Sequence, residues 1–184
     1  MNGIGPGRDG VMRKPGAGRR RMNRASPRAL AAVRLRRGRI ADLDALTAIE
    51  QAVFDTEILS RRSFRRFVNA RSATLIVAEA DGKIAGYVLA LYPPRAKHAR
   101  LYSIAVAPHA GRRGVGTKLL TAAEAAARRR DRRAMRLEVH EHNGRAIARY
   151  EKAGYRLFGR YRHYYDNGGD ALRFVKPLAR DRRR

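Results

Sequence analysis

The sequence predicts a mixed α/β domain flanked by two basic ends. A chain of 184 residues is long enough for one domain with tails. Hydrophobic residues make up 44% of it, which suffices for a packed core. From a first short strand at residues 33–36 onward, β-rich runs alternate with amphipathic stretches in the order β-α-α-β-β-β-α-β-α-β-β. We therefore predict a disordered basic arm at 1–32, one domain at 33–178 and a basic tail at 179–184.

Two helices and a hairpin are expected in the first half of the domain. Asp42 and Ser60 are of the types that cap helices, and each precedes apolar residues at helical spacing. The β-rich runs at 74–79 and 83–91 flank the dipeptide Asp81-Gly82. Asp-Gly between two such runs is typical of a two-residue hairpin turn.

The second half follows the same alternation. The expected elements are a strand at 101–106, a long helix after a glycine-rich loop, a strand at 134–139, a helix from Asn143 to Gly154, and strands at 155–165 and 171–175.

The amino-acid composition excludes several classes of protein. The chain has no cysteine, which rules out a disulfide scaffold, a thiolate metal site and a cysteine nucleophile. The same absence fits a reducing compartment, and we expect a cytoplasmic protein. No apolar run approaches the roughly 18 residues that a membrane-spanning helix needs. We therefore expect no membrane association.

The formal net charge of +26 is unevenly distributed along the chain. Residues 1–38 carry +10 and residues 180–184 carry +3, which leaves +13 on residues 39–179. The first segment is rich in Gly, Pro and Arg and has no apolar periodicity, as in disordered arms. Such an arm is either solvated or makes nonspecific contacts with nucleic acid, and the sequence leaves both interpretations open. The run of basic residues at 128–133 has no role that the sequence assigns.

A glycine-rich loop at 111–116, Gly-Arg-Arg-Gly-Val-Gly, joins a predicted strand to a predicted helix. Glycines allow successive backbone N–H groups to converge, and the helix N-terminus adds about half a positive charge. Such a loop can therefore bind phosphate. It is neither a P-loop nor a dinucleotide fingerprint, and from its spacing alone an ordinary tight turn is an equal alternative.

Four stretches together resemble the GNAT acyltransferase superfamily: LYSIAVAP, RRGVGTKLL, RLEVHEHNGRAIARYEKAGYRLFGR and YYDNGGDALRF. The resemblance covers about residues 34–178 and is greatest to the RimI-like branch, the ribosomal-protein-alanine N-acetyltransferases. It implies the GNAT fold, a central splayed mixed sheet flanked by helices. It also implies that acetyl-coenzyme A is the co-substrate and binds between the strands that end near Val106 and Val139.

The resemblance also implies which residues bind acetyl-coenzyme A. Backbone groups of Ile104, Ala105 and Val106 would contact the pantetheine arm and the thioester carbonyl. Asn143 aligns with a residue that contacts the cofactor. The residues that would wrap the pyrophosphate are Arg112, Arg113, Gly114, Val115, Gly116 and Thr117. One position departs from the family pattern, because Gly111 stands where a Gln or Arg is usual.

Acetyl transfer to an amine requires a base and an acid. An α-amine has a pKa of about 8 and must lose its proton to act as a nucleophile, and the leaving thiolate must gain one. By the resemblance, Glu138 aligns with the catalytic base and Tyr150 with the acid. Alternation along the strand is consistent with this, because Glu138 faces away from the apolar Leu137 and Val139.

Two further groups of side chains have open interpretations. His140 and His142 could bind a metal, act as an auxiliary base or lie in an exposed loop. No third ligand is evident near them, so we expect no metal. Tyr161, Tyr164 and Tyr165 could shape the acceptor site or pack on a strand face.

The predicted function is transfer of an acetyl group from acetyl-coenzyme A to a primary amine. The resemblance favours a protein or peptide N-terminus, such as that of a ribosomal protein, as the acceptor. The +13 of the central segment disfavours polycationic acceptors. Two alternatives remain: an RNA- or ribosome-binding module of the same fold that uses its basic arms, and an acetyltransferase of small-molecule amines. The sequence does not reveal the oligomeric state.

Overall fold

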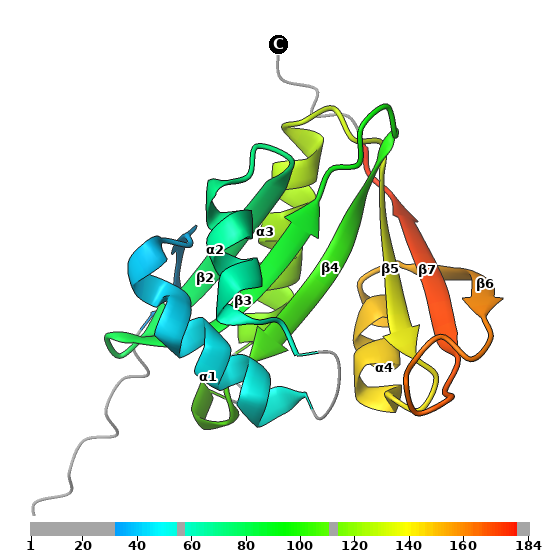
Figure 1. Cartoon of the computed structure of the whole chain (residues 1–184). Coiled ribbons are helices and arrows are strands. Elements are labelled where there is room, and N and C mark those ends of the chain that lie inside the picture. The colour runs from blue at the N-terminus through cyan, green and yellow to red at the C-terminus, as the bar shows by residue number, and fades with distance from the viewer. Residues whose placement is uncertain (1–31, 55–57, 111–113, 180–184) are drawn as a thin grey trace, which may run out of the picture. The chain divides into compact units, whose positions relative to one another are not determined.

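The helices and strands occur in the predicted order (Figure 1). The computed structural model describes residues 32–54, 58–110 and 114–179. The predicted basic arm, apart from residue 32, and the tail beyond residue 179 lie outside them. The elements are β1 Arg34–Arg37, α1 Leu43–Val53, α2 Arg61–Asn69, β2 Ala73–Ala80, β3 Lys83–Leu91, β4 His98–Val106, α3 Val115–Arg128, β5 Ala134–His140, α4 Gly144–Lys152, β6 Arg156–Tyr161 and β7 Ala171–Pro177, with short 3-10 turns at Ile40–Asp42 and Pro108–Ala110.

The local signals in the first half mostly act as predicted. The Ser60 hydroxyl accepts a hydrogen bond from the backbone N–H of Ser63 and so caps α2. Asp81 and Gly82 have positive φ angles of 52° and 72°, as a tight hairpin turn requires. The Asp42 prediction was wrong in detail. Its carboxylate does not cap α1 but accepts from the backbone of Arg39 and pairs with Arg36 at 2.7 Å.

The seven strands form one mixed sheet in the order β1-β2-β3-β4-β5-β7-β6. All neighbouring pairs are antiparallel except β4 and β5, which run parallel. These two strands pair only from His98 opposite Ala134 to Leu101 opposite Leu137. Beyond that point they separate, and Figure 1 shows the widening gap between them. The sheet is therefore splayed, as the resemblance predicted.

Helices cover the two halves of the sheet unequally. In Figure 1, α1 and α2 lie across the near side of β2 and β3, and α3 lies behind these strands. Among the described helices, none crosses the near side of β5, β7 and β6 in that view. The alternate residues Met135, Leu137 and Val139 of β5 are buried in the core. The residues between them therefore project to the uncovered face.

The last hairpin differs from the prediction, which extended a strand over 155–165. β6 ends at Tyr161, and the next residues form a hydrogen-bonded loop instead of a ladder. The backbone N–H groups of Tyr164 and Tyr165 both donate to the carbonyl of Gly169, and Asp170 accepts from the backbone of His163. These bonds satisfy the backbone locally, so the strand need not continue.

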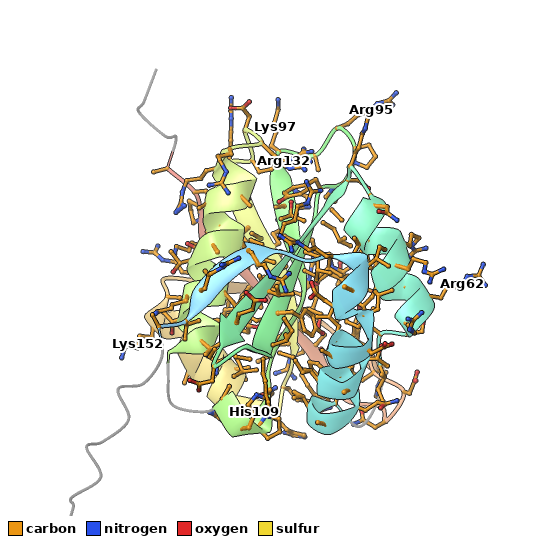
Figure 2. The ribbon with its side chains drawn as sticks, turned by 90° about the vertical axis from the view of Figure 1, so that its left-hand side faces the viewer. Arg62, Arg95, Lys97, His109, Arg132 and Lys152 are labelled. Atoms are coloured by element: carbon orange, nitrogen blue, oxygen red, sulfur yellow. The ribbon has the colours of Figure 1, made fainter. Side chains whose placement is uncertain are left out.

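Two arginines of the basic run at 128–133 make contacts that stabilise the fold. Arg130 donates to the backbone carbonyl of Arg71 at 2.6 Å, and Arg132 bonds a carbonyl of the loop before β4. Both guanidinium groups also lie over the ring of Tyr92, at 4.3 and 5.8 Å from its centre. Other basic side chains, such as Arg62, Arg95 and Lys97, point away from the ribbon (Figure 2). In the described part of the chain, no helix is long and apolar enough to cross a membrane.

Gly86 permits β3 and β4 to approach closely beside the gap. It pairs with Val106, and a Cβ at this position would lie 2.6 Å from the carbonyl oxygen of Ala105. Backbone atoms cannot yield as the end of a flexible side chain does. A side chain at residue 86 would therefore push away the end of β4 that borders the gap.

We expect Gly86→Ala to lower the free energy of unfolding by about 1–3 kcal/mol, as overpacking in cores does. Denaturant unfolding measures this. Gly144→Ala is the matched control, because no atom lies within 4 Å of a Cβ there and its φ is not positive. The control should unfold at the wild-type denaturant concentration or above it. Equal midpoints for Gly86→Ala and the wild type would contradict the close approach.

Candidate active site

The gap between β4 and β5 leaves part of β4 with one free edge. The register of β4 against β3 shifts at Tyr102, since Leu89 faces Ser103 and Ala90 faces Leu101. Beyond this bulge the predicted cofactor residues 104–106 pair with β3, and no described strand pairs with their other side. Backbone groups on that edge are available to an extended ligand.

The N-terminus of α3 provides a second set of backbone donors. Gly114 is its N-cap, with a left-handed φ of 68°, and no side chain caps the helix there. The first-turn amides of Val115, Gly116 and Thr117 therefore have no side-chain acceptor, as in helix N-termini that bind anions. The predicted contacts from Arg112 and Arg113 lie outside the described residues.

Arg149 is a cation beside this helix end that the sequence reasoning did not single out. Its guanidinium lies against Gly116, where a Cβ would come within 3.1 Å of it. Arg149 belongs to α4, so it brings positive charge from the far side of the gap to the amides of α3. Arg149 directly precedes the predicted residue Tyr150 in the sequence. Only the fold, however, brings their helix to the glycine-rich turn.

Glu138 projects from β5 to the uncovered face, as the alternation predicted. Its side chain is 13% exposed, and one carboxylate oxygen lies 2.8 Å from Nε of Arg100 on β4. Arg100 also donates to the hydroxyl of Tyr164 at 3.1 Å. Burial lowers the pKa of Arg100, but the charge of Glu138 and the two hydrogen bonds outweigh this and raise the pKa above its ordinary value. Arg100 thus holds the carboxylate of Glu138 in place through a charged hydrogen bond.

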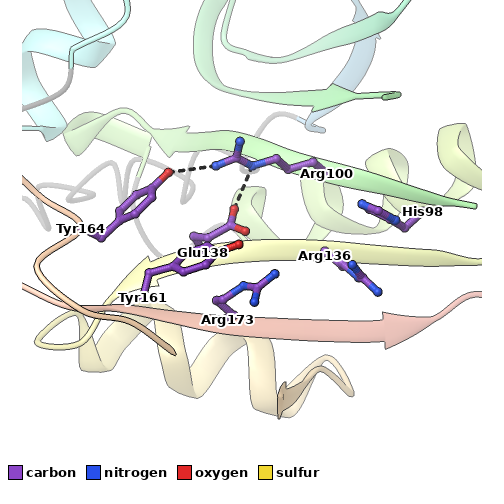
Figure 3. Close-up of a pocket in the computed structure, with 7 residues that line it drawn as sticks. All are labelled: His98, Arg100, Arg136, Glu138, Tyr161, Tyr164 and Arg173. Carbon is purple, nitrogen blue, oxygen red and sulfur yellow. Dashed lines mark hydrogen bonds and ion pairs between the residues drawn. The ribbon is translucent and has the colours of Figure 1, made fainter. Parts of the chain in front are cut away.

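A pocket of about 360 Å³ surrounds this carboxylate (Figure 3). It spans the strands next to the gap and the loop after β6. Its lining residues are His98, Arg100, Arg136, Glu138, Tyr161, Tyr164 and Arg173. Strand alternation directed Glu138 to this face, and the sequence left Tyr161 and Tyr164 open between shaping the acceptor site and packing on a strand. It gave no reason to single out the three arginines.

Tyr150 does not line that pocket but lies buried in α4, with 5% of its surface exposed. Its ring packs on Tyr155 with the two ring centres 5.8 Å apart. Burial raises the pKa of its hydroxyl to about 12, although the charge of nearby Arg149 acts in the opposite direction. The hydroxyl therefore keeps its proton at neutral pH.

The structure gives local roles to the other predicted residues. The Asn143 side chain accepts from the backbone of Ala146 at 3.1 Å and caps α4. His140 stacks on Tyr165 at 4.8 Å between ring centres, and Tyr165 is not among the residues that line the pocket. His142 is exposed, and the described residues contain no group of three or more side chains suited to hold a metal ion.

Glu50 is a buried carboxylate that the sequence reasoning missed. It is 1% exposed, and the backbone N–H of Leu59 donates to it at 2.7 Å. The hydroxyl of Tyr87 on β3 donates to its other oxygen and lies 2.7 Å from the hydroxyl of Ser103 on β4. This network joins α1, the start of α2 and the bulged part of β4. The signal was present, because Glu50 lies four residues after the core residue Leu46 on the same helix face.

The Acetyltransferase (GNAT) family matches residues 43–155 of the chain. An N-alpha-acetyltransferase of Sulfurisphaera tokodaii is 31% identical over 156 residues, which are 79% of this chain and 93% of that protein. The solved ribosomal-protein-S18-alanine N-acetyltransferase of Escherichia coli matches with a TM-score of 0.72 and 26% identity over 83% of this chain and 99% of its own. A ribosomal-protein-alanine N-acetyltransferase from Brucella melitensis gives a TM-score of 0.70 and 25% identity over 79% and 99%.

The chain therefore belongs to the GNAT acetyltransferase family, and it is an N-acetyltransferase. The fold and family predicted from the sequence are both confirmed. Its similarity extends to relatives of the RimI type and to N-alpha-acetyltransferases.

Burial raises the pKa of Glu50, and this makes a prediction about stability. A carboxyl whose pKa is higher in the folded than in the unfolded protein stabilises the fold most when protonated, below its unfolded pKa of about 4.3. That stabilisation is lost as the pH rises through the folded pKa. Glu50→Gln cannot titrate, so the wild type should gain melting temperature relative to this variant between about pH 7 and about pH 4.5.

Thermal unfolding of both proteins across this range measures the effect. The matched control is Glu151→Gln, whose exposed side chain should leave the difference from the wild type constant. A difference between the wild type and Glu50→Gln that does not change with pH would contradict the buried position of this carboxylate.

Proposed function

We propose that this enzyme transfers the acetyl group of acetyl-coenzyme A to the N-terminal α-amine of a protein or peptide, with Glu138 as base and Tyr150 as acid. The observation that carries the proposal is the position of Glu138. It is a shielded carboxylate in a pocket beside the point where β4 and β5 separate. The names of the relatives from Sulfurisphaera tokodaii and Escherichia coli support an N-terminal amine as the acceptor.

The described residues fit acetyl-coenzyme A as the donor. The free edge of residues 104–106 suits the amides of an extended pantetheine arm, and the uncapped amides of α3 suit its pyrophosphate. Arg149 would add charge at that helix end. Asn143 would contact the cofactor from its exposed position at the start of α4. Its side-chain carbonyl oxygen already accepts a hydrogen bond from the backbone of Ala146.

Glu138 takes a proton from the acceptor amine as the reaction proceeds. The amine lone pair then attacks the thioester carbonyl carbon, a C–N bond forms and the C–S bond breaks. Arg100 holds the carboxylate in place, because its Nε donates to one carboxylate oxygen at 2.8 Å. Direct transfer in this way needs no acetyl group on the enzyme itself.

Tyr150 donates its hydroxyl proton to the thiolate that leaves. Its raised pKa, about 12, means that the hydroxyl is protonated at every physiological pH. Its proton is thus present when the sulfur needs it. Exchange with water or with the proton held by Glu138 restores the starting state. The balance is one amine and one thioester consumed, and one amide and one thiol formed.

We expect Glu138→Gln to lower kcat/KM by about 10²–10⁴, the usual contribution of a positioned base. The deficit should shrink as the pH rises past the pKa of the amine, about 8, because free amine then forms without the base.

Tyr150→Phe should lower kcat while leaving the KM for acetyl-coenzyme A nearly unchanged. Release of coenzyme A with a peptide acceptor, measured across pH, gives all of these values.

Glu151→Gln is the control for both variants, because it removes an exposed carboxylate next to Tyr150 in α4. Its kinetics should match those of the wild type. Wild-type turnover in Glu138→Gln and Tyr150→Phe at every pH would show that these residues do not have the proposed roles.

A further inference from the structure

We propose that the pocket around Glu138 selects acceptors with an acidic side chain at the second or third residue from the free amine. The inference rests on the proposed function, in that the amine is taken to lie at Glu138. Arg136 and Arg173 are the residues that would bind the acidic side chain. The juxtaposition of these two arginines with the carboxylate is visible in Figure 3.

The strand register gathers positive charge on this face of the sheet. Arg100 on β4 lies directly opposite Arg136 on β5, and Arg173 on β7 lies directly opposite Glu138. Like charges placed directly opposite one another on neighbouring strands destabilise a sheet. The facing pair of Arg100 and Arg136 therefore fits a site that receives a negative charge from outside.

The two arginines have no carboxylate partner in the described part of the chain, whereas Arg100 is paired with Glu138. Nε of Arg136 and Nε of Arg173 are both buried without a hydrogen-bond partner. A buried donor left unpaired is costly, and structures normally satisfy it. Neither guanidinium group therefore has its charge matched by an anion of the described chain.

Aromatic rings hold both guanidinium groups in position. Arg173 lies 4.6 Å from the centre of the Phe158 ring and 4.1 Å from that of Tyr161, and Arg136 lies 5.3 Å from Phe158. Stacked guanidinium groups are restricted in motion, so less entropy is lost when they bind a planar carboxylate. The two guanidinium groups are thus preorganised to bind an anion.

The charge balance of the pocket also favours an anionic ligand. Its lining contains three arginines and one carboxylate, so two positive charges remain uncompensated by the lining itself. Burial lowers the pKa of His98 at the pocket edge, and the charges of Arg136 and Arg132 lower it further. The lowered pKa disfavours the charged form of His98, so this residue is not expected to add a third uncompensated positive charge to the pocket.

The distances along the sheet indicate which residue of the acceptor peptide lies near the two arginines. Arg136 is two residues from Glu138 on the same face of β5, about 7 Å away along the strand, and Arg173 is its cross-strand neighbour at about 5 Å. An extended peptide rises about 3.3 Å per residue. A peptide whose amine lies at Glu138 therefore brings its second or its third side chain within reach of the arginines, since successive side chains of an extended chain point to opposite sides.

The test is an acceptor panel of three peptides that begin Ala-Glu-Glu, Ala-Gln-Gln and Ala-Arg-Arg and are otherwise identical. Acetylation is followed by coenzyme A release, and binding of each peptide in the presence of coenzyme A is followed by calorimetry. We expect the acidic peptide to have the highest kcat/KM, by at least about tenfold over the neutral one. Arg136→Gln and Arg173→Gln should each remove most of this preference, measured as the ratio of the kcat/KM values for the acidic and the neutral peptide.

Arg62→Gln is the matched control, since it removes one exposed guanidinium of α2 that is not part of the pocket. It should keep the wild-type preference. Equal or better use of the neutral or basic peptide by the wild type would overturn the inference while leaving N-terminal acetylation intact. A higher KM for acetyl-coenzyme A in both pocket variants, without a change of acceptor preference, would assign the arginines to the donor and also overturn it.

The binding measurement separates this inference from the proposed function. Arginine-dependent binding of the acidic peptide without acetylation of any peptide would support the pocket and contradict the proposed function. Acetylation without any dependence on the acidic residues would support the proposed function and contradict the pocket.

Discussion

After Leu101 and Leu137 the parallel strands β4 and β5 stop pairing, and the candidate functional groups border the opening that results. A strand that loses its neighbour exposes backbone N–H and C=O groups that need partners. In the proposed function, the pantetheine arm of acetyl-coenzyme A, an extended chain that carries amides, supplies these partners. Gly86 and the bulge at Tyr102 allow β4 to bend away while it stays paired with β3. The buried carboxylate of Glu50 ties α1 and α2 to the same part of β4.

The large positive charge of the chain has several separate explanations in the structure. Arg130 and Arg132 hold the turn between α3 and β5 through carbonyl groups and an aromatic ring. Arg149 lies at the N-terminus of α3, where a polyanionic co-substrate is proposed to bind. Arg136 and Arg173 are stacked and lack an anion in the described chain. Among the described residues, several arginines thus make local contacts, so the net charge does not by itself indicate nucleic acid.

Much of the fold was predictable from the sequence, because its signals are local. The alternation of elements, the Ser60 cap and the Asp81-Gly82 hairpin depend on neighbouring residues. Glu138 was also predictable, since its orientation follows from strand alternation. The pairing of Arg100 with Glu138, the arginines of the pocket and the proximity of Arg149 to Gly116 were not. The first two depend on register between strands distant in sequence, and the third depends on how α4 packs beside α3, which no local pattern reveals.

Hydrogen–deuterium exchange of the full chain, with and without acetyl-coenzyme A, tests the central claim that the separation of β4 and β5 forms the reaction site. The account predicts slower exchange at the free-edge amides of residues 102–106 and at the first-turn amides of α3 when the co-substrate binds. Amides of β1 and β2, which lie at the far side of the sheet, should be unchanged. Protection confined to other strands, or no protection at β4 and α3 at saturating acetyl-coenzyme A, would contradict it.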